Sequence, residues 1–406
     1  MQTRLADFIR DTHAGHEAKT ILRQCVHCGF CAATCPTYGL LSDELDSPRG
    51  RIYQIKHPLE GDPVTAHTQL HLDRCLTCQA CETTCPSGVR YGRLLDIGRS
   101  VIEQRHPRPL RQRLMRKALA GVLPVNALMA PAIRLGQRLK PLLPAAIARK
   151  VPNTQPRLPW PEPRHPRRVI ALTGCIQAIT TPNTNHALAT LLDRCGISLI
   201  AAPTAGCCGA IEHHLGESQA ALHRMRRNID AWWPLIDAGA ETLLVAASGC
   251  GVTVKDYGHQ LAHDPHYADK ADTIAKLARD PVELLETLPL TSLPIHSHGR
   301  RIAFHAPCTL QHGQQLSGRI ETLLTRLGFE LTDVPDAHLC CGSAGTYSLL
   351  QPELSQRLLN NKLTALESGA PTRIATANIG CQLHLATAAT LPVMHWLDLL
   401  AQALDT

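Results

Sequence analysis

Two runs of cysteines near the start of the chain have a spacing that suits iron-sulfur chemistry. In each run the cysteines follow the pattern C-x2-C-x2-C-x3-C and precede a proline: Cys25, Cys28, Cys31, Cys35 before Pro36, and Cys75, Cys78, Cys81, Cys85 before Pro86. Three thiolates at these spacings hold one [4Fe-4S] cubane, while the fourth reaches a neighbouring cluster. Zinc is the alternative, but its ligands usually come as two pairs separated by a longer loop. The spacing therefore predicts two [4Fe-4S] clusters.

The crossed position of the fourth cysteine predicts which thiolates share a cluster. The first cluster is expected at Cys25, Cys28, Cys31 and Cys85. The second is expected at Cys75, Cys78, Cys81 and Cys35.

A different cysteine pattern occurs twice in the rest of the chain. Its two copies are Cys175, Cys207, Cys208, Cys250 and Cys308, Cys340, Cys341, Cys381. The first two cysteines of each copy are 32 residues apart, which indicates an internal duplication. Four thiols in each copy suit a further cluster, a zinc ion or a redox-active surface. We weakly favour a cluster. Cys195 has no counterpart and is expected to pack in the core.

Around these cysteines, apolar runs alternate with helical stretches, as in parallel α/β sheets. The expected strands are 169–173, 197–201, 242–247, 302–305, 329–334 and 373–377. The expected helices are 184–194, 217–233, 319–327 and 352–368. We expect the cysteines at the carboxyl ends of the strands, where open α/β sheets bind ligands.

The fold class that follows is multidomain: a mostly helical, ferredoxin-like domain with two clusters, then two duplicated α/β cysteine-rich domains. We expect the first domain at 1–104, a basic, proline-rich segment at 105–168, and the cysteine-rich domains at 169–297 and 298–406. A length of 406 residues is consistent with several domains.

The basic segment carries 15 of the 41 Lys and Arg residues and one acid, Glu162, in a chain of net charge +7. We expect short helices near 110–120 and 131–139, then an extended run at 151–166. The charge favours an anionic lipid surface or an acidic partner subunit, with a solvated linker as the alternative. Nucleic acid is excluded as a partner, because aromatic interleaving and recognisable reading motifs are both missing.

The N-terminus has no apolar signal segment, and no apolar run favours a transmembrane helix. We therefore expect cytoplasmic, metal-bound thiols and peripheral contact with the inner face of the cell membrane.

The cysteine runs and the motifs around them resemble a known family, the iron-sulfur subunits of flavin-linked hydroxyacid and glycerol-3-phosphate dehydrogenases. The resemblance is strongest to those of membrane-associated glycolate oxidases. The matching stretches are 25–31 (CVHCGFC), 46–53 (DSPRGRIY), 72–78 (LDRCLTC), 228–233 (NIDAWW) and 338–345 (HLCCGSAG). Heterodisulfide reductase is a more distant relative, from which the chain departs at Ala247 and Asn378, where that family has cysteines.

The resemblance implies an electron-transfer subunit of a flavin-dependent complex that oxidises glycolate, with D-lactate as a second candidate substrate. Cubane clusters transfer single electrons, and the chain shows no nucleotide-binding motif, so we expect the flavin on partner flavoprotein subunits and no catalytic residue here. A membrane quinone is the expected acceptor. The alternatives are the corresponding subunit of a lactate or glycerol-3-phosphate dehydrogenase, a heterodisulfide-reductase-like enzyme, and a scaffold in which the duplicated cysteines bind zinc.

Overall fold

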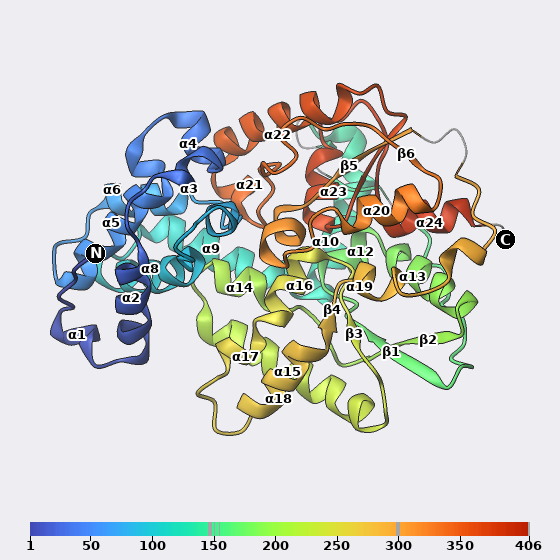
Figure 1. The fold of residues 1–406 in the computed structure, drawn as a ribbon, viewed down its shortest axis with the longest axis horizontal. Helices are drawn as coiled ribbons and strands as arrows, with labels where there is room; N and C mark the ends of the chain where they lie inside the picture. The colour runs from blue at the N-terminus through green and yellow to red at the C-terminus, as the bar shows by residue number, and fades with distance from the viewer. Residues whose placement is uncertain (145–147, 150, 154, 298–300, 405–406) are drawn as a thin grey trace. The chain divides into compact units, whose positions relative to one another are not determined.

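The computed structural model describes residues 1–144, 148–149, 151–153, 155–297 and 301–404, and the chain divides into two compact units (Figure 1). The first unit comprises Met1–Arg116 and His338–Lys362. The second comprises Lys117–Ala337 and Leu363–Thr406. The segment that carries Cys340 and Cys341 therefore belongs to the same unit as the N-terminal cysteine runs.

The described part of the first unit is helical. Its elements are α1 (Asp7–Arg10), α2 (His13–Gln24), α3 (Phe30–Ala33), α4 (Pro36–Leu41), η1 (Glu44–Asp46), α5 (Pro48–Glu60), α6 (Ala66–Asp73), α7 (Ala80–Thr83), α8 (Tyr91–Arg105), α21 (Tyr347–Leu350) and most of α22 (Pro352–Glu367). The short helices α3 and α7 each begin one residue before the third cysteine of a run, Cys31 or Cys81. The cysteine runs thus lie on loops and single helical turns between longer helices.

The longer helices form the apolar core that supports these loops. Ser47 caps α5 by accepting a hydrogen bond from the Gly50 amide (3.0 Å), and Pro48 occupies the first helical position, a favoured start for a helix. Its Ile55 packs directly against Gly98 of α8, where a Cβ atom would lie 2.6 Å from Ile55 Cγ1. Only glycine fits at this position, so α5 and α8 can approach closely.

The second unit contains two parallel sheets in its described residues. The first sheet has the order β2-β1-β3-β4, and the second has the order β6-β5-β7-β8. The strands are β1 (Arg167–Ala171), β2 (Ile197–Ala201), β3 (Leu243–Leu244), β4 (Ala278–Arg279), β5 (Arg301–His305), β6 (Glu330–Leu331), β7 (Arg373–Thr376) and β8 (Val393–His395). The same strand order in both sheets is the structural form of the sequence duplication.

One apolar core contains residues from both sheets of the second unit. Val169 of β1, Phe304 of β5 and Trp396 of α24 (Trp396–Ala403) all belong to it. The other described helical elements of this unit are α10 (Asn126–Leu139), η2 (Lys140–Leu142), α12 (Ile176–Thr180), α13 (Asn183–Arg194), α14 (Ala210–His214), α15 (Ser218–Asp237), α16 (Ser248–Lys255), α17 (Tyr257–Gln260), α18 (Ala268–Leu277), α19 (Pro281–Leu285), η3 (Leu290–Ser292), the π-helix η4 (Thr309–Gly313), α20 (Arg319–Arg326) and α23 (Ile379–Leu385). The two halves are therefore packed as one body.

The fold class predicted from the sequence is confirmed: helical cysteine runs precede duplicated α/β domains with parallel sheets. The expected strands are all present, but β3 and β6 are shorter than predicted, with two residues each. In β3, pairing with β1 ends at Leu244. Beyond it the chain bends toward α16, so the apolar residues Val245 and Ala246 are buried as a turn rather than as strand.

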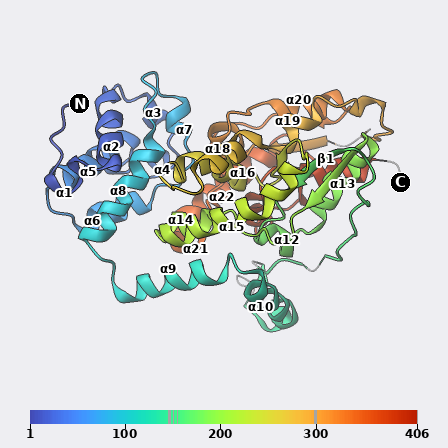
Figure 2. The same cartoon turned by 90° about the horizontal axis from the view of Figure 1, so that it is seen from below.

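The basic segment contains the two helices expected from the sequence, α9 (Leu110–Val122) and α10 (Figure 2). Within the described residues, no single helix is long and apolar enough to cross a membrane. By length and composition alone, α9 and the stretch Asn126–Leu142 satisfy that test together, with a bend of 100° between them.

Candidate iron-sulfur centres

A cavity of about 430 Å³ in the first unit brings together thiols of both N-terminal runs. It is lined by the first three cysteines of one run and the fourth of the other, Cys25, Cys28, Cys31 and Cys85, together with Cys81. Cys25 ends α2, Cys31 lies on α3, and Cys85 follows α7. Cys28 is exposed, so this cavity reaches the surface.

A second cavity of about 400 Å³ has the complementary set of thiols. It is lined by Cys75, Cys78, Cys81 and Cys35. Cys75 follows α6 and Cys81 lies on α7, while Cys35 caps α4, whose first residue is Pro36. The fourth cysteine of each run therefore lines the cavity of the other run, and Cys81 lines both cavities.

The two cysteine loops share an unusual backbone. His27 and Gly29 in the first run, and Thr77 and Gln79 in the second, all have positive φ angles, between 54° and 87°. Residues in this conformation turn successive amides to one side of the chain. In the second loop the Thr77 amide donates to Cys75 Sγ (3.5 Å). Amides directed at sulfur fit a cluster whose thiolates and sulfides accept hydrogen bonds.

The buried thiols need a positive partner to lose their protons. Burial and the neighbouring thiols Cys25 and Cys28 together raise the pKa of Cys31 to about 11, because clustered negative charges repel one another. Burial likewise raises the pKa of Cys81. Bound iron supplies the positive charge that keeps such thiols deprotonated. The residues of both cavities therefore fit [4Fe-4S] clusters.

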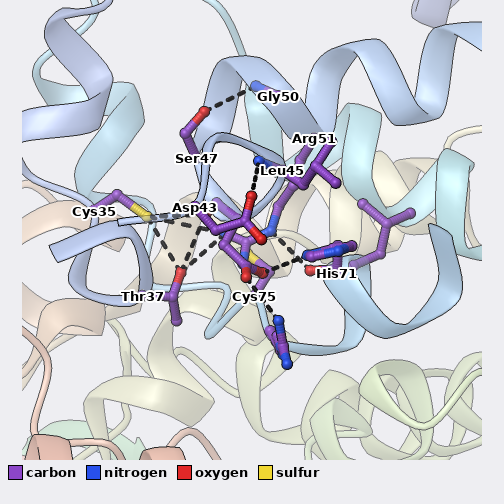
Figure 3. A network of polar contacts seen from close by, with 12 residues as sticks. Cys35, Thr37, Asp43, Leu45, Ser47, Gly50, Arg51, His71 and Cys75 are labelled. Atoms are coloured by element: carbon purple, nitrogen blue, oxygen red, sulfur yellow. Dashed lines mark hydrogen bonds and ion pairs between the residues drawn. The ribbon is translucent and has the colours of Figure 1, made fainter. Parts of the chain in front are cut away.

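A buried ion pair joins the two cysteine runs beside the second cavity. Arg51 Nη2 donates to Asp46 Oδ1 at 3.0 Å, and Arg74 Nη1 donates to Asp46 Oδ2 at 2.9 Å. Asp46 and Arg51 are fully buried. Figure 3 shows Arg51 directed into this network together with Cys35, Thr37 and His71. Since Arg74 precedes Cys75, the network fixes one cysteine of each run around the same cavity.

Arg51 places a positive charge next to the expected cluster thiolates. Its Nη1 donates to Thr37 Oγ1 at 3.1 Å and lies 3.9 Å from Cys35 Sγ. Burial opposes the charge, but Cys75, Tyr91, Cys35 and Asp46 outweigh it and raise the pKa of Arg51 above its usual value. Arg49, two residues earlier, is half-buried, lines the first cavity and pairs with Glu44 at 2.6 Å. Arg51 is therefore the buried arginine beside the second cavity, whereas Arg49 lies at the first cavity with a solvated partner.

Tyr91 is a second polar contact to the expected cluster ligands. This residue is buried, and its hydroxyl donates to Cys75 Sγ at 3.7 Å. Burial and the Cys75 thiol raise the pKa of Tyr91, so its hydroxyl keeps its proton and remains a donor. Hydrogen bonds to cluster sulfurs stabilise the more negative, reduced state and raise the reduction potential.

The four cysteines of the first duplicated half come together at the carboxyl ends of β1 and β2. Cys175 Sγ lies 3.5 Å from Cys207 Sγ, and the Gly209 amide donates to Cys207 Sγ at the same distance. Hydrogen bonds from Cys175 and Cys208 lower the pKa of Cys207, which favours a thiolate there. Cys250, on α16, interacts with Cys208.

Two buried side chains hold the Cys207-Cys208 loop. Asn228 of α15 accepts from the Gly206 amide and donates to the Cys207 carbonyl, both at 2.8 Å. Tyr257 donates from its hydroxyl to the Cys208 carbonyl at 2.9 Å. The loop is therefore fixed from within the first half.

The cysteines of the second half belong to both units. Cys308 caps η4 after β5, and Cys381 lies on α23 after β7. Both are at carboxyl ends of strands in the second unit, whereas Cys340 and Cys341 belong to the first unit. Convergence of these four cysteines on one site stays a prediction.

The structure shows the contacts of two residues that the sequence analysis singled out, Asn378 and Cys195. Asn378 stands where the heterodisulfide family has a cysteine, and its amide Nδ2 donates to Cys381 Sγ at 3.4 Å. It is therefore a donor to a thiol rather than a ligand. Cys195 ends α13 and packs against the apolar core, as expected.

The sequence indicated the cysteines but not most of the contacts around them. Arg51 was noted in the motif 46–53, but the roles of Asp46 and Tyr91 were missed. The short run Asp46-Ser47-Pro48-Arg49-Gly50-Arg51 between the two cysteine runs was the signal that could have located the ion pair.

Comparison with known proteins defines the class. Residues 21–89 match the 4Fe-4S dicluster domain, and residues 169–255 and 302–386 match the cysteine-rich domain called CCG. A solved structure of a hypothetical protein from Helicobacter pylori shares the fold, with a TM-score of 0.53 over 97% of this chain and 73% of that chain at 8% identity. The chain is an iron-sulfur protein with a dicluster domain and a duplicated cysteine-rich domain.

The family follows from two relatives that match nearly the whole chain. The glycolate oxidase iron-sulfur subunit of Escherichia coli is 56% identical over 406 residues, all of both chains. The probable glycolate oxidase iron-sulfur subunit of Bacillus subtilis is 29% identical over 94% of each. The lactate utilization protein A of Geobacillus thermodenitrificans is 24% identical over 54% of this chain and 90% of its own length. The chain belongs to the family of glycolate oxidase iron-sulfur subunits.

Replacing Arg51 with Met should destabilise the cluster-loaded protein by about 3 to 5 kcal/mol, because Asp46 would lose its fully buried partner. The midpoint of urea unfolding, followed by circular dichroism and by the visible absorption of the clusters, measures this effect.

The matched control is Arg49→Met on the same helix, which removes a half-exposed ion pair with Glu44 beside the first cavity and should change the midpoint much less. Equal midpoints for the two variants would contradict a structural role of the buried pair.

Proposed function

We propose that this chain is the electron-transfer iron-sulfur subunit of a complex that oxidises glycolate to glyoxylate. Partner flavoprotein subunits remove two electrons from glycolate, and this chain passes them on singly toward a membrane quinone. The observation that carries the proposal is the pair of adjacent cavities, each lined by the thiols of a predicted cubane. A [4Fe-4S] cluster supplies one-electron chemistry and no hydride chemistry.

The family supports glycolate as the substrate of the complex. The relative with 56% identity over its full length is named a glycolate oxidase subunit, whereas the lactate utilization proteins match only about half of this chain. No contact in the described structure favours a disulfide-cleaving enzyme, since Asn378 and Ala247 occupy the positions of the cysteines that distinguish that family.

The ligand sets proposed for the clusters are those predicted from the spacing. Cys25, Cys28, Cys31 and Cys85 hold the first cluster, and Cys75, Cys78, Cys81 and Cys35 hold the second. Their arrangement around two cavities supports this assignment. In the duplicated halves we propose a further metal centre, for which the closely spaced thiols of Cys175 and Cys207 are the best support.

We propose that electrons enter at the first cluster. Electron transfer between proteins requires their redox centres to lie close together, and Cys28 is the exposed cysteine of the first set. Val26 and Phe30 on either side of it are 68% and 61% exposed. An exposed apolar loop directly over a metal site suits a protein partner. The flavoprotein is the partner whose electrons this position would accept.

We also propose that α10 contacts the membrane surface. Leu128, Leu135 and Leu139 are between 41% and 57% exposed, and their spacing places them on one helical face. Arg134 and Arg138 are exposed on the same helix. An apolar face flanked by basic residues is typical of helices that lie at an anionic bilayer.

Part of the positive charge in the basic segment is already paired within the chain. Arg108 and Arg116 both pair with Asp73, and Arg164 pairs with Asp193. The exposed arginines of α10 are therefore better candidates for lipid contact than these paired arginines are. On this proposal the protein is cytoplasmic and attached to the inner face of the cell membrane.

The isolated chain should not oxidise glycolate with any dye acceptor, although dithionite should reduce its clusters. Adding the flavoprotein subunits and glycolate should bleach the clusters, as followed by stopped-flow absorbance. Phe30→Asp should slow this step without changing the iron content, while Leu70→Asp, at another exposed apolar residue of the same unit, should not. Turnover by the chain alone would refute the electron-carrier function.

Cys78→Ser should remove one cubane and about half of the N-terminal iron, because it deletes a predicted ligand. Cys195→Ser is the control, since this thiol packs against the core and lines neither cavity. Anaerobic iron and sulfide counting with electron paramagnetic resonance measures both. Equal iron loss in the two variants would show that the ligand sets are wrong.

Leu135→Asp with Leu139→Asp should release the protein from vesicles that contain an anionic phospholipid, because charge on the apolar face opposes insertion. Co-sedimentation at low and high salt measures binding. Leu158→Asp, at a leucine of similar exposure outside α10, is the control. Unchanged binding of the α10 variant would refute the membrane contact.

A further inference from the structure

The segment His338–Lys362 is attached to the cluster-binding helices through both of its helices. At α21, the Tyr347 hydroxyl donates to the carbonyl oxygen of Arg74 at 3.2 Å. At α22, Arg357 Nη2 donates to the carbonyl oxygen of Leu40, the residue before the last of α4, at 2.9 Å. Arg74 directly precedes Cys75, which lines the second cavity, and Leu40 lies on the helix whose first two residues, Pro36 and Thr37, also line it.

The same segment holds the Cys340-Cys341 motif in a fixed shape. Gly342 has a φ of 87°, and a Cβ there would lie 2.7 Å from the Ser355 carbonyl oxygen, so glycine is required for this close packing on α22. Ser355 Oγ donates to the Gly342 carbonyl at 2.8 Å, and the Gly342 amide donates to Cys340 Sγ at 3.4 Å. The motif is therefore fixed on α22, and Tyr347 follows its glycine by five residues at the start of α21.

Tyr347 interacts electrostatically with a thiol of the second cysteine run, Cys75, and with Cys340 of the duplicated motif. Its side chain is buried, with 6% exposed. Burial raises the pKa of Tyr347, and Cys75 and Cys340 raise it further, so the phenol is within electrostatic reach of both thiols. Its hydroxyl therefore remains a donor to the backbone that orients Cys75.

The Cys-Cys-Gly motif of the first half belongs to the other compact unit. Counting from this motif, the counterpart of Tyr347 is His214, which is exposed and belongs to the second unit. The Cys207-Cys208 loop is held by Asn228 and Tyr257 of its own half. The duplicated halves thus differ in which compact unit holds their Cys-Cys-Gly motif.

We infer that Tyr347 is a positioning residue that couples the second cluster to the Cys340-Cys341 motif, so that a change at this motif alters the second cluster and leaves the first unaltered. The carrying observation is the hydrogen bond from Tyr347, five residues after the Cys-Cys-Gly loop held on α22, to the backbone of Arg74. This inference rests on the proposed ligand sets, and it assigns to the second half a role that the first half does not share.

The test uses the purified full chain with its clusters, reduced stepwise with dithionite and followed by electron paramagnetic resonance. Cys78→Ser first identifies the signal of the second cluster by its loss. Tyr347→Phe, which removes only the hydroxyl, should keep the iron content and shift the midpoint potential and line shape of that signal. Tyr267→Phe is the control, because it removes a hydroxyl that donates to Asp230 in the second unit.

Two further pairs of variants make the test independent of any folding defect in Tyr347→Phe. Arg357→Ala should shift the same signal. Gln356→Ala should not, because the Gln356 side chain donates to Asn360 in its own helix. Cys341→Ser should also shift it, whereas Cys208→Ser should leave it unchanged.

The outcome separates this inference from the ligand assignment. If Cys78→Ser removes one signal but Tyr347→Phe and Cys341→Ser leave that signal unaltered, the coupling is refuted and the ligand sets stand. A shift of the other cluster's signal, or equal shifts from Cys341→Ser and Cys208→Ser, would also overturn it.

Discussion

The buried contact of Asp46 with Arg51 and Arg74 is the interaction on which the cluster site depends. The two cysteine runs are separate in the sequence, and each contributes its fourth thiol to the cavity of the other. This exchange of the fourth thiol requires the two runs to be held in fixed positions beside each other when the clusters bind. Asp46 does this because it lies between the runs and binds one arginine from α5 and one that precedes Cys75. This buried pair acts together with a second link between the runs, the hydrogen bond from Thr34 Oγ1 to the Ala80 carbonyl at 3.3 Å.

The same network sets the charge around the second cavity. Two arginines against one carboxylate leave a net positive charge beside Cys35 and Cys75, and Tyr91 adds a hydrogen bond to Cys75. Both effects favour the more negative, reduced cluster. The first cavity instead has an exposed cysteine, Cys28. Solvent exposure is a separate factor that sets the reduction potential of a cluster. The two clusters are therefore expected to differ in potential even though their ligand spacing is identical.

The sequence predicted correctly those features whose positions follow from a single physical rule, such as cysteine spacing or apolar periodicity. Ligand spacing specifies the two cysteine runs, and the equal 32-residue spacing between the first two cysteines of each copy revealed the duplication that the two sheets share. Strand and helix positions followed from apolar periodicity, as for β2 and α20. The membership of Tyr347 in the N-terminal unit did not follow, because a hydrogen bond to the Arg74 carbonyl joins residues that are 273 positions apart and leaves no trace in local pattern. Domain boundaries drawn along the sequence cannot represent such an arrangement.

The duplication also shows how equal sequence spacing can support unequal roles. In the first half, Asn228 and Tyr257 hold the Cys-Cys-Gly loop from inside the domain. In the second half, Ser355 and the packing of Gly342 hold the corresponding loop on α22, which is itself bonded to α4. The backbone shape of the motif is conserved between the halves, since Gly209 and Gly342 share nearly the same φ, but its supporting residues differ. The Cys-Cys-Gly motif of the second half therefore lies in the same compact unit as the N-terminal cysteine runs, whereas that of the first half lies in the second unit.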